Sequence, residues 1–311
     1  MKAKKIIKRV VLSVVALLLV AVLVLCGITF FYYPHYTKSK RVEDLSLNKG
    51  LDSSSGDSFV RVMSCNVRCI NPLDTGKRSW FYRADLLLNG IEKTYPGVIG
   101  FQEVTKWQYK YLTDALPEYD SVVTYRDKAI NSESCPVFYD KTMYKLIDKG
   151  SFWLSETPDE MSKGWGAACY RICSYVILET TQSGKQFVVF NLHLDHVSEE
   201  ARINGINLVL EKIKAFGGYP AVIMGDFNAE ENTQTYAAVT EMFDDAKYKL
   251  TNPQISCTYQ GFGEKLDADC IDYFMISKKG WEVHDYQVLT DTYNGVYPSD
   301  HFQLFTLLEL V

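Results

Sequence analysis

Three apolar stretches of this chain border aspartate, asparagine or histidine. They lie at 187–193, 220–228 and 299–305. If each stretch is a strand, its polar residues lie at one end of that strand, and Asp226 and Asn228, two positions apart, share one side. Several strands of this kind predict a single polar site at the rim of a sheet core. Carboxylate, amide and imidazole groups in one place are typical of metal-assisted chemistry on phosphate.

Four acidic residues belong to the same pattern: Glu103, Asp226, Asp272 and Asp300. At one partly buried rim these carboxylates would repel one another strongly. A divalent cation removes most of that penalty and polarises a phosphoryl oxygen. The ligands are hard oxygen atoms, and no cysteine stands in a zinc-binding pattern. The sequence therefore predicts Mg²⁺ or Mn²⁺ as the cofactor.

The elements that position these residues alternate between strand and helix. Strands are expected at 59–67, 98–101, 121–125, 137–139, 171–179, 186–192, 221–224, 271–276, 283–289 and 302–308. Helices are expected near 80–93, 107–116 and 198–216. This pattern predicts an α/β (α+β) four-layer sandwich, with two mixed, mostly antiparallel β-sheets packed face to face and flanked by helices. No linker follows residue 58, so residues 59–311 are predicted to form one catalytic domain.

The N-terminus differs from the rest of the chain. Residues 1–9 hold five basic and no acidic residues, and residues 10–33 carry no charge. At 1.5 Å per residue, this run reaches about 36 Å, enough to cross a bilayer with some tilt. We expect a transmembrane signal anchor at 10–33, with a cytosolic segment at 1–9 and a flexible tether at 34–58. A cleaved signal peptide is the alternative, but Leu23-Val24-Leu25 before Cys26 are bulky for a cleavage site.

The net charge bears on the ligands of the chain, and the positions of the cysteines bear on disulfide bonds. Beyond residue 9 the chain holds 28 basic and 38 acidic residues, a balance of −10, which disfavours unspecific binding to a polyanion. The cysteines lie in apolar, strand-like runs, so they are interpreted as buried free thiols, although one disulfide bond stays possible.

A single-pass protein of the cell membrane with an extracellular catalytic domain is expected. No obligate protein partner is evident.

Six motifs occur in a fixed order. They are Ser64-Cys65-Asn66-Val67-Arg68, Gly100-Phe101-Gln102-Glu103-Val104, Asn191-Leu192-His193-Leu194-Asp195-His196, Gly225-Asp226-Phe227-Asn228-Ala229, Cys270-Ile271-Asp272-Tyr273-Phe274 and Tyr297-Pro298-Ser299-Asp300-His301-Phe302. Together they resemble the endonuclease/exonuclease/phosphatase superfamily of metal-dependent phosphoesterases. The segment 152–173 further resembles an uncharacterised bacterial subgroup, from which Gly166 and Tyr170 depart.

The resemblance implies a role for each site residue. Glu103, Asn66 and Asp300 are the predicted metal residues, although Asn66 would serve equally by placing the residues around the metal. The predicted catalytic residues are His193, Asp226, Asn228, Asp272 and His301. In this scheme Asp226 orients or deprotonates the attacking water, Asn228 and His193 contact the phosphate, and Asp272 fixes the tautomer of His301. Arg171 and Asn191 are the predicted substrate-binding residues.

Each of these residues also has a structural reading. Glu103 suits a helix cap, Asn66 suits a turn, and Asp226 with Asn228 suits an Asx turn. For Arg171, a structural salt bridge is as consistent with the sequence as a phosphate contact.

The leading hypothesis is a membrane-anchored, divalent-metal-dependent hydrolase of phosphoester bonds, phosphodiesterase- or nuclease-like, that acts by in-line attack of an activated water. One alternative keeps the site but takes a lipid or sugar phosphate as the substrate instead of nucleic acid. Four aromatic residues near the predicted rim suit either reading: Trp153, Trp165, Tyr259 and Phe262. A second alternative is a catalytically inactive binding protein on this fold.

Overall fold

The computed structural model describes residues 2–28, 58–251, 257–268 and 270–311. The N-terminal helix α1 spans Lys2–Gly27, so it begins eight residues before the predicted anchor. Its segment Ala3–Gly27 is long and apolar enough to cross a membrane, a property that a signal sequence shares. The end of the predicted anchor, from residue 29, and nearly all of the predicted tether lie outside the described residues.

Twelve strands in the described part form two six-stranded sheets. The first sheet has the order β11 (Trp281–Leu289), β12 (Gln303–Leu310), β1 (Phe59–Asn66), β2 (Val98–Gln102), β4 (Val137–Asp140), β3 (Tyr119–Val122). The second has the order β5 (Tyr144–Trp153), β6 (Ile172–Thr180), β7 (Gln186–His193), β8 (Ala221–Asp226), β10 (Asp272–Ser277), β9 (Phe243–Asp245). Only β1–β2 and β7–β8 pair in parallel, so both sheets are mixed and mostly antiparallel, as predicted.

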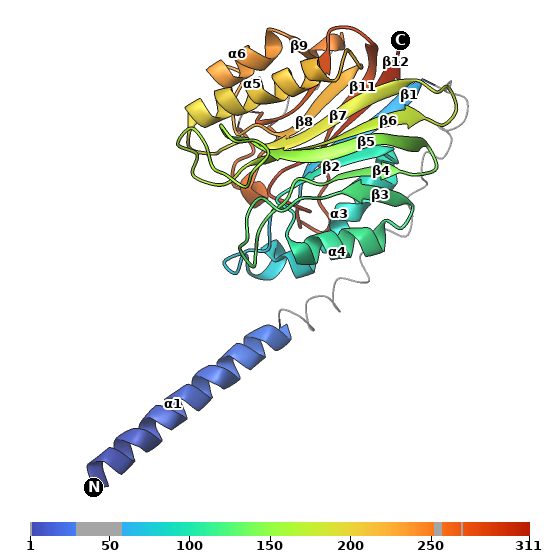
Figure 1. Cartoon of the computed structure of the whole chain (residues 1–311). Helices are drawn as coiled ribbons and strands as arrows, with labels where there is room; N and C mark the ends of the chain where they lie inside the picture. Colours follow the sequence, from blue (N-terminus) through green and yellow to red (C-terminus); the bar gives the residue numbers. More distant parts are fainter. Residues whose placement is uncertain (1, 29–57, 252–256, 269) are drawn as a thin grey trace.

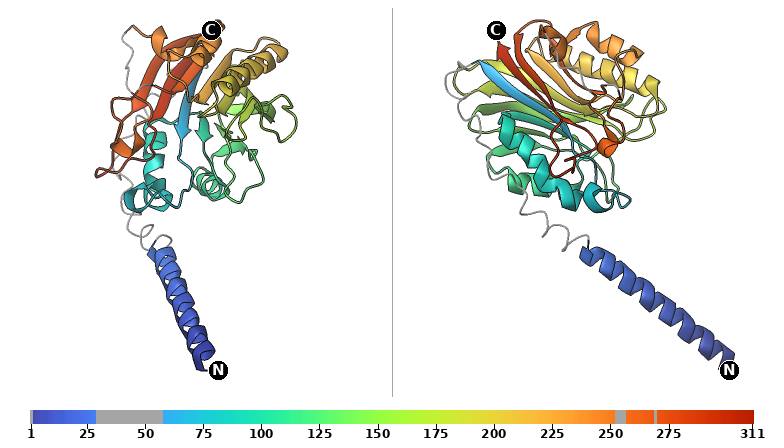
Figure 2. Two further views of the ribbon diagram at one scale, coloured as in Figure 1. Left: turned by 90° about the vertical axis from the view of Figure 1, so that its left-hand side faces the viewer. Right: turned by 180° about the vertical axis from the view of Figure 1, so that it is seen from behind.

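Helices cover the outer face of each sheet. The helices α3 (Trp80–Thr94) and α4 (Lys106–Ala115) flank the first sheet, and α5 (Glu199–Ala215) and α6 (Gln234–Thr240) flank the second (Figure 1). The two sheets lie face to face between these helix layers when the molecule is turned (Figure 2). Short 3-10 helices occur at Gly76–Arg78, Ala246–Lys249 and Gly261–Gly263. The predicted four-layer sandwich is confirmed.

The three largest hydrophobic cores of the described residues correspond to the three spaces between the layers. Val62, Val189 and Phe274 belong to the central core, where the inner faces of the two sheets meet. A second core joins α5 to the second sheet, and a third joins α3 and α4 to the first. Strands buried on both faces must be apolar along their whole length, which explains runs such as 221–224 and 187–190.

The sequence pattern does not reveal three of the elements. The strand β5 is an edge strand whose middle residues are exposed and charged, so its alternation is weak. The helix α6 has seven residues and β9 three, too few for a periodic pattern to be recognised. The strand expected at 121–125 lies at Tyr119–Val122 instead, because the chain turns away after Val122 into a bridge between Tyr125 and Ser134.

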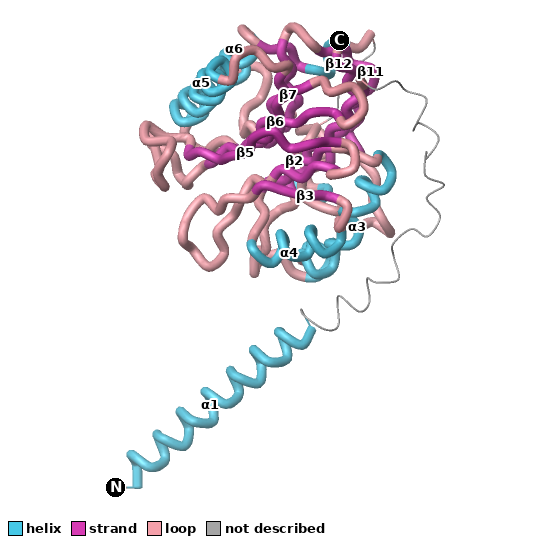
Figure 3. The backbone as a smooth tube through the Cα atoms, turned by 45° about the vertical axis from the view of Figure 1, so that its right-hand side comes forward, coloured by secondary structure: helices cyan, strands magenta, loops and turns pink. Residues whose placement is uncertain are grey.

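The strand directions bring several chain segments to one edge of the sandwich. The parallel strands β1, β2, β7 and β8 all end there, while β10 and β12, antiparallel to their neighbours β8 and β1, begin there. In the tube view the long connecting loops gather beside the ends of β2 and β5 (Figure 3). These strand ends and loops carry the predicted site residues.

Candidate active site

The second sheet aligns three predicted catalytic residues by backbone register. His193, the last residue of β7, pairs with Asp226, the last residue of β8. Asp226 in turn pairs with Asp272, the first residue of β10. Just before Asp226, Gly225 has a φ of +133° and lies so close to the neighbouring strand that a Cβ there would stand 2.0 Å from the Leu192 carbonyl oxygen. Only glycine fits this position, which aims Asp226 at the edge of the sheet.

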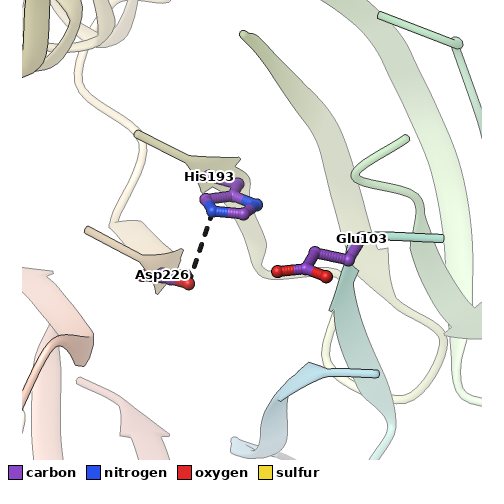
Figure 4. Close-up of side chains that lie close together, drawn as sticks. All are labelled: Glu103, His193 and Asp226. Carbon is purple, nitrogen blue, oxygen red and sulfur yellow. Dashed lines mark ion pairs between the residues drawn. The ribbon is translucent and has the colours of Figure 1, made fainter. Parts of the chain in front are cut away.

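The first sheet contributes Asn66 and Glu103 from the other side. The amide nitrogen of Asn66 donates hydrogen bonds to Glu103 Oε1 at 3.2 Å and to Asp226 Oδ2 at 3.0 Å, so it joins the two sheets. Glu103 follows β2 with a left-handed φ of 62° and accepts a hydrogen bond from the Cys69 backbone N–H at 2.9 Å. In Figure 4 the Glu103 carboxylate points toward His193 and Asp226. This side chain therefore joins the cluster rather than capping a helix.

Asp272 and His301 form a hydrogen-bonded pair. His301 Nδ1 lies 2.9 Å from Asp272 Oδ2, while its Nε2 faces Asp226 Oδ2 at 3.7 Å. Burial opposes a charge on His301, but Asp272 and Asp226 outweigh it and raise its pKa well above the ordinary value. The imidazole thus holds its proton and presents Nε2–H to the site.

His193 lies in different electrostatic surroundings. Its Nε2 is 3.4 Å from Asp226 Oδ2, as the dashed line in Figure 4 marks. Burial, together with the positive charges of Arg171 and Arg126, lowers its pKa well below the ordinary value. His193 is therefore neutral at physiological pH and serves as a hydrogen-bond donor or acceptor rather than as a charge.

Asp226 faces both histidines, and its pKa is shifted as well. Burial and the neighbouring Asp272 raise its pKa to about 7, against the opposing effect of His301. For Glu103, burial opposes ionisation, but the Cys69 N–H and the charges of His301 and Arg68 lower its pKa overall. A carboxyl group whose pKa is near 7, next to a carboxylate that is ionised, is suited to proton transfer and to binding a cation.

The donor set fits a divalent cation. Ligand atoms of Glu103, His193 and Asp226 all lie within 4.8 Å of one another, and so do those of Asp226, Asp272 and His301. Carboxylate oxygens dominate, as Mg²⁺ and Mn²⁺ prefer. The side-chain oxygen of Asn66 accepts from the Arg68 N–H at 2.9 Å, and its nitrogen faces the carboxylates. Of the two roles predicted for Asn66, this geometry favours placing the neighbouring residues over binding the metal.

Asp300 lies on the opposite flank of the cluster, 3.7 Å from Arg68 Nη1. Among the described residues it is in neither of the two ligand groups at this edge. Burial raises its pKa, and the positive charges of His301 and Arg68 act against that shift. The metal role expected of Asp300 from the sequence stays a prediction.

Asn228 and Asn191 differ in how they bond. The Asn228 N–H donates to Asp226 Oδ1 at 2.9 Å, an Asx turn, and its side-chain nitrogen donates to the Leu194 carbonyl at 3.1 Å. Asn191 is fully buried between the sheets, where it accepts from Gln102 at 2.6 Å and donates to the carbonyls of Phe101 and Pro136. All of these bonds go to protein groups and tie the sheets together, a geometry that disfavours the substrate contact predicted for Asn191.

Arg171 lines a pocket next to Glu103 and His193, and it also forms an ion pair. Its Nε is 3.6 Å from Asp195 Oδ2, and its Nη2 is 3.0 Å from His196 Nδ1. Asp195 also accepts from the backbone N–H groups of Ala168, Cys169, Val197 and Ser198. Burial opposes its ionisation, but these four donors lower its pKa to about 2. The salt bridge predicted as the alternative role of Arg171 is present.

Sequence reasoning missed two of the organising residues. Asp195 lies inside one of the six motifs, yet nothing in the spacing of that motif indicates that its carboxylate binds the backbone N–H groups of a distant loop at Ala168 and Cys169. Arg83, on α3, is fully buried and donates to the carbonyls of Val67, Arg68 and Pro298. It thus links the loop after Asn66 to the loop before His301. A cation within the apolar run of α3 was the available signal for it.

The aromatic residues predicted at the rim occupy different places. The Tyr259 ring lies 5.0 Å from the His301 ring, and Phe262 stacks with Arg78 and Arg83. The indole N–H of Trp153 donates to the Arg126 carbonyl at 2.8 Å, and Trp165 has a left-handed φ of 50°. Tyr259 therefore lies nearest the catalytic cluster. The thiols of Cys65, Cys135 and Cys173 are buried and free, and burial raises the pKa of Cys65 and Cys135 to about 12.

Comparison with known proteins agrees with this geometry. The model of the Endonuclease/Exonuclease/phosphatase family matches residues 63–301. The chain belongs to this family. The match includes every residue of the cluster, from Asn66 to His301. It supports the hydrolysis of phosphoester bonds as the activity of the chain.

Two solved structures and one curated relative illustrate the similarity. An endonuclease/exonuclease/phosphatase from Bacteroides vulgatus is 32% identical and covers 82% of this chain and 100% of its own, with a TM-score of 0.77. The mannosyl-6-phosphatase of Bacteroides thetaiotaomicron is 34% identical and covers 81% of this chain and 99% of its own, with a TM-score of 0.73. Mouse nocturnin is 24% identical over 308 residues, 86% of this chain and 70% of nocturnin.

Proposed function

We propose that this protein is a divalent-metal-dependent phosphoester hydrolase whose active site is the cluster around Asp226. The observation that carries the proposal is the meeting of Asn66 and Glu103, from one sheet, with His193, Asp226 and His301 at the same edge of the sandwich. Carboxylates and hydrogen-bond donors together match what a metal-bound phosphate requires.

Each side chain has a distinct task in the proposed reaction. Glu103 and Asp226 hold Mg²⁺ or Mn²⁺, which when bound polarises a phosphoryl oxygen and offsets the charge of the carboxylates. Asp226 also orients the attacking water and accepts its proton. His301, kept protonated by Asp272, and the neutral His193 donate hydrogen bonds to phosphoryl oxygens as charge grows on them. Asn228 lies beside Asp226 as a further donor.

Two substrate classes have support. A phosphodiester such as nucleic acid is supported by the nucleases in the family. The net charge of −10 beyond residue 9, however, disfavours binding to a long polyanion. A sugar phosphate is supported by the 34% identity to a mannosyl-6-phosphatase over nearly all of that chain.

The N-terminal helix supports a membrane-bound enzyme. Its apolar span follows a basic segment, which by the positive-inside rule supports an orientation with the catalytic domain on the outer face of the cell membrane. Protease treatment of intact cells tests this topology. Digestion of the catalytic domain is expected, and protection of the domain would contradict the outward orientation.

Hydrolysis assays test the activity itself. The full chain in detergent is incubated with p-nitrophenyl phosphate and bis(p-nitrophenyl) phosphate, with Mg²⁺, Mn²⁺ or a chelator. We expect metal-dependent hydrolysis that falls by about 10³-fold in Asp226→Ala and in His301→Ala. Asp148→Ala, on the exposed part of β5, is the matched control and is expected to keep full activity. Wild-type rates in the two site variants would mean that hydrolysis takes place at another site, whereas no metal-dependent hydrolysis by the unchanged chain would favour the inactive binding protein.

A further inference from the structure

The loops around the proposed active site carry the most exposed hydrophobic side chains of the catalytic domain. Among its described residues, six large hydrophobic side chains have 60% or more of their surface exposed. One of the six is Val311, the last residue of the chain. The other five lie in segments that adjoin the active-site edge and are called the apolar rim: Leu73, Trp107, Ile130, Val197 and Leu266. One exposed leucine is ordinary, but five such side chains at one edge are not.

The strand directions place the apolar rim at this edge. On the first sheet, Leu73 follows the end of β1, Trp107 lies at the start of α4 just after β2, and Ile130 lies between β3 and β4. On the second sheet, Val197 follows the end of β7 and Leu266 precedes β10. The strands β1, β2 and β7 end at the active-site edge, while β4 and β10 begin there. The rim therefore includes loops from both sheets, on the side where the catalytic cluster lies.

The opposite edge of the sandwich has no such set among its described residues. Its turns at 181–185 and 278–280 hold only polar residues and glycine. Apart from the terminal Val311, the exposed large hydrophobic side chains there are Met143 and Met242, with 43% and 37% of their surface exposed. Exposed apolar side chains that gather on one face of a domain mark an interaction site.

Exposed lysines stand next to three members of the apolar rim. They directly precede Trp107 and Leu266 and lie two positions before Ile130: Lys106, Lys265 and Lys128. Tryptophan and lysine together match the headgroup level of a bilayer, where the apolar parts meet acyl chains and the ammonium group meets lipid phosphates. Because the chain beyond residue 9 has a net charge of −10, this attraction is local. The apolar side chains must supply most of the binding.

The chain itself brings a bilayer close to the rim. The segment Ala3–Gly27 of α1 is long and apolar enough to span a membrane. Residues 28–58 join it to β1, and a segment of this length reaches at most about 100 Å. The catalytic domain of an anchored chain therefore stays near the membrane surface, at a high effective concentration. Even weak contacts of the rim with lipid then suffice for docking.

We infer that the active-site edge is a membrane-docking face, in which the apolar rim enters the boundary between headgroups and acyl chains of the bilayer that α1 spans. The cluster around Asp226 then faces the headgroups. This arrangement favours phosphoesters carried at the membrane surface over those in bulk solution. The inference rests on the membrane anchoring proposed above and adds an interaction surface to it.

Quenching of tryptophan fluorescence by brominated lipids tests the docking, because bromine quenches an indole only at close range. The full chain is reconstituted into vesicles of phosphatidylcholine and phosphatidylglycerol, with and without bromine on the acyl chains. The helix α1 contains no tryptophan, so the signal comes from the catalytic domain. The emission of Trp107 is the difference between the unchanged chain and Trp107→Phe. We expect it to fall by roughly half in brominated vesicles, as insertion at interfacial depth requires.

Charged substitutions locate the contact. A chain with both Leu73→Glu and Ile130→Glu carries two carboxylates in the rim, which should reduce the quenching at least about threefold. Val311→Glu is the matched control, since Val311 is similarly exposed but follows β12 at the opposite edge, and it should leave the quenching unchanged. Both variants should hydrolyse p-nitrophenyl phosphate in detergent at the wild-type rate and keep the wild-type melting temperature, because the changed residues are exposed and lie outside the cluster.

The outcomes separate this inference from the proposed function. No quenching of Trp107 in the unchanged chain, or equal quenching in the chain with both rim substitutions, would overturn the docking. A dimer in detergent that the two rim substitutions dissociate would assign the rim to a second copy of the chain instead. The quenching needs no turnover. An unchanged chain that docks but hydrolyses no phosphoester would therefore contradict the proposed function and support the docking face.

Discussion

The surroundings of His193 and His301 make an instructive contrast. Both imidazoles are buried at strand ends and both face the same oxygen of Asp226, at 3.4 Å and 3.7 Å. Yet the pKa of His301 is raised and that of His193 is lowered. Burial opposes a positive charge on both rings; at His301 the carboxylates of Asp272 and Asp226 outweigh burial, whereas at His193 the positive charges of Arg171 and Arg126 add to it. The other charged residues around each ring therefore decide its charge. The site thus combines one cationic and one neutral donor.

The largest expected effect comes from removing the residue behind His301. Asp272→Asn keeps the size of the side chain but loses its charge, so His301 no longer holds its proton in the orientation that presents Nε2–H. We expect kcat/KM to fall by about 10³-fold, with little change in KM. Steady-state kinetics on p-nitrophenyl phosphate measure this. Activity within threefold of the wild type would show that Asp272 does not set the state of His301.

A smaller loss is expected at the neutral histidine. Glutamine offers an N–H donor in place of imidazole Nε2–H, without a charge. His193→Gln should therefore cost about 10²-fold in kcat, less than His301→Gln in the same assay. If the two substitutions reduce kcat equally, the contrast between a neutral and a cationic imidazole is wrong.

Metal binding should also distinguish the two histidines. At pH 7, loss of a cation close to Glu103 and Asp226 should strengthen Mg²⁺ binding roughly tenfold in His301→Gln. In the proposed reaction Glu103 and Asp226 hold the metal and His193 contacts the phosphate, so His193→Gln, which removes no charge, should leave the affinity unchanged. Titration of the melting temperature with Mg²⁺ reports the affinity, and Glu103→Gln should weaken the response. A tighter site in both histidine variants would contradict the contrast.

The smallest effects are expected in the pH dependence of stability, measured without metal. A raised pKa means that the contribution of His301 is full below about pH 6.5, the unfolded value, and is lost as pH rises through the folded pKa. For His193 the sign is opposite: its lowered pKa costs stability as pH falls below about 6.5. Relative to the wild type, His301→Gln and His193→Gln should give slopes of opposite sign, of at most about 1.4 kcal/mol per pH unit. Slopes of the same sign would be inconsistent with the assigned charges.

The sequence predicts the architecture well because strands buried on both faces carry unbroken apolar runs. The polar residues at the ends of these runs, such as Asp226 and His301, can be recognised for the same reason. What the sequence hides is the direction in which a side chain points. Asn191 lies in a recognised motif, but the alternation of the strand turns it between the sheets.

Contacts between distant loops are hidden in the same way. Arg126 and Glu133 belong to a loop without any periodic pattern, and only the bridge at its base brings them beside His193. The lowered pKa of His193 therefore could not be foreseen from the motifs, because one of its causes is a residue more than sixty positions away.

The tie that Asn66 makes across the sandwich has a consequence for how the enzyme comes into being. Each sheet carries only part of the proposed active site, since Asn66 and Glu103 come from one sheet and His193 and Asp226 from the other. A newly made chain with only half of its layers in place has nothing that can cut a phosphate ester. We therefore expect turnover to return during refolding only after the two sheets have docked.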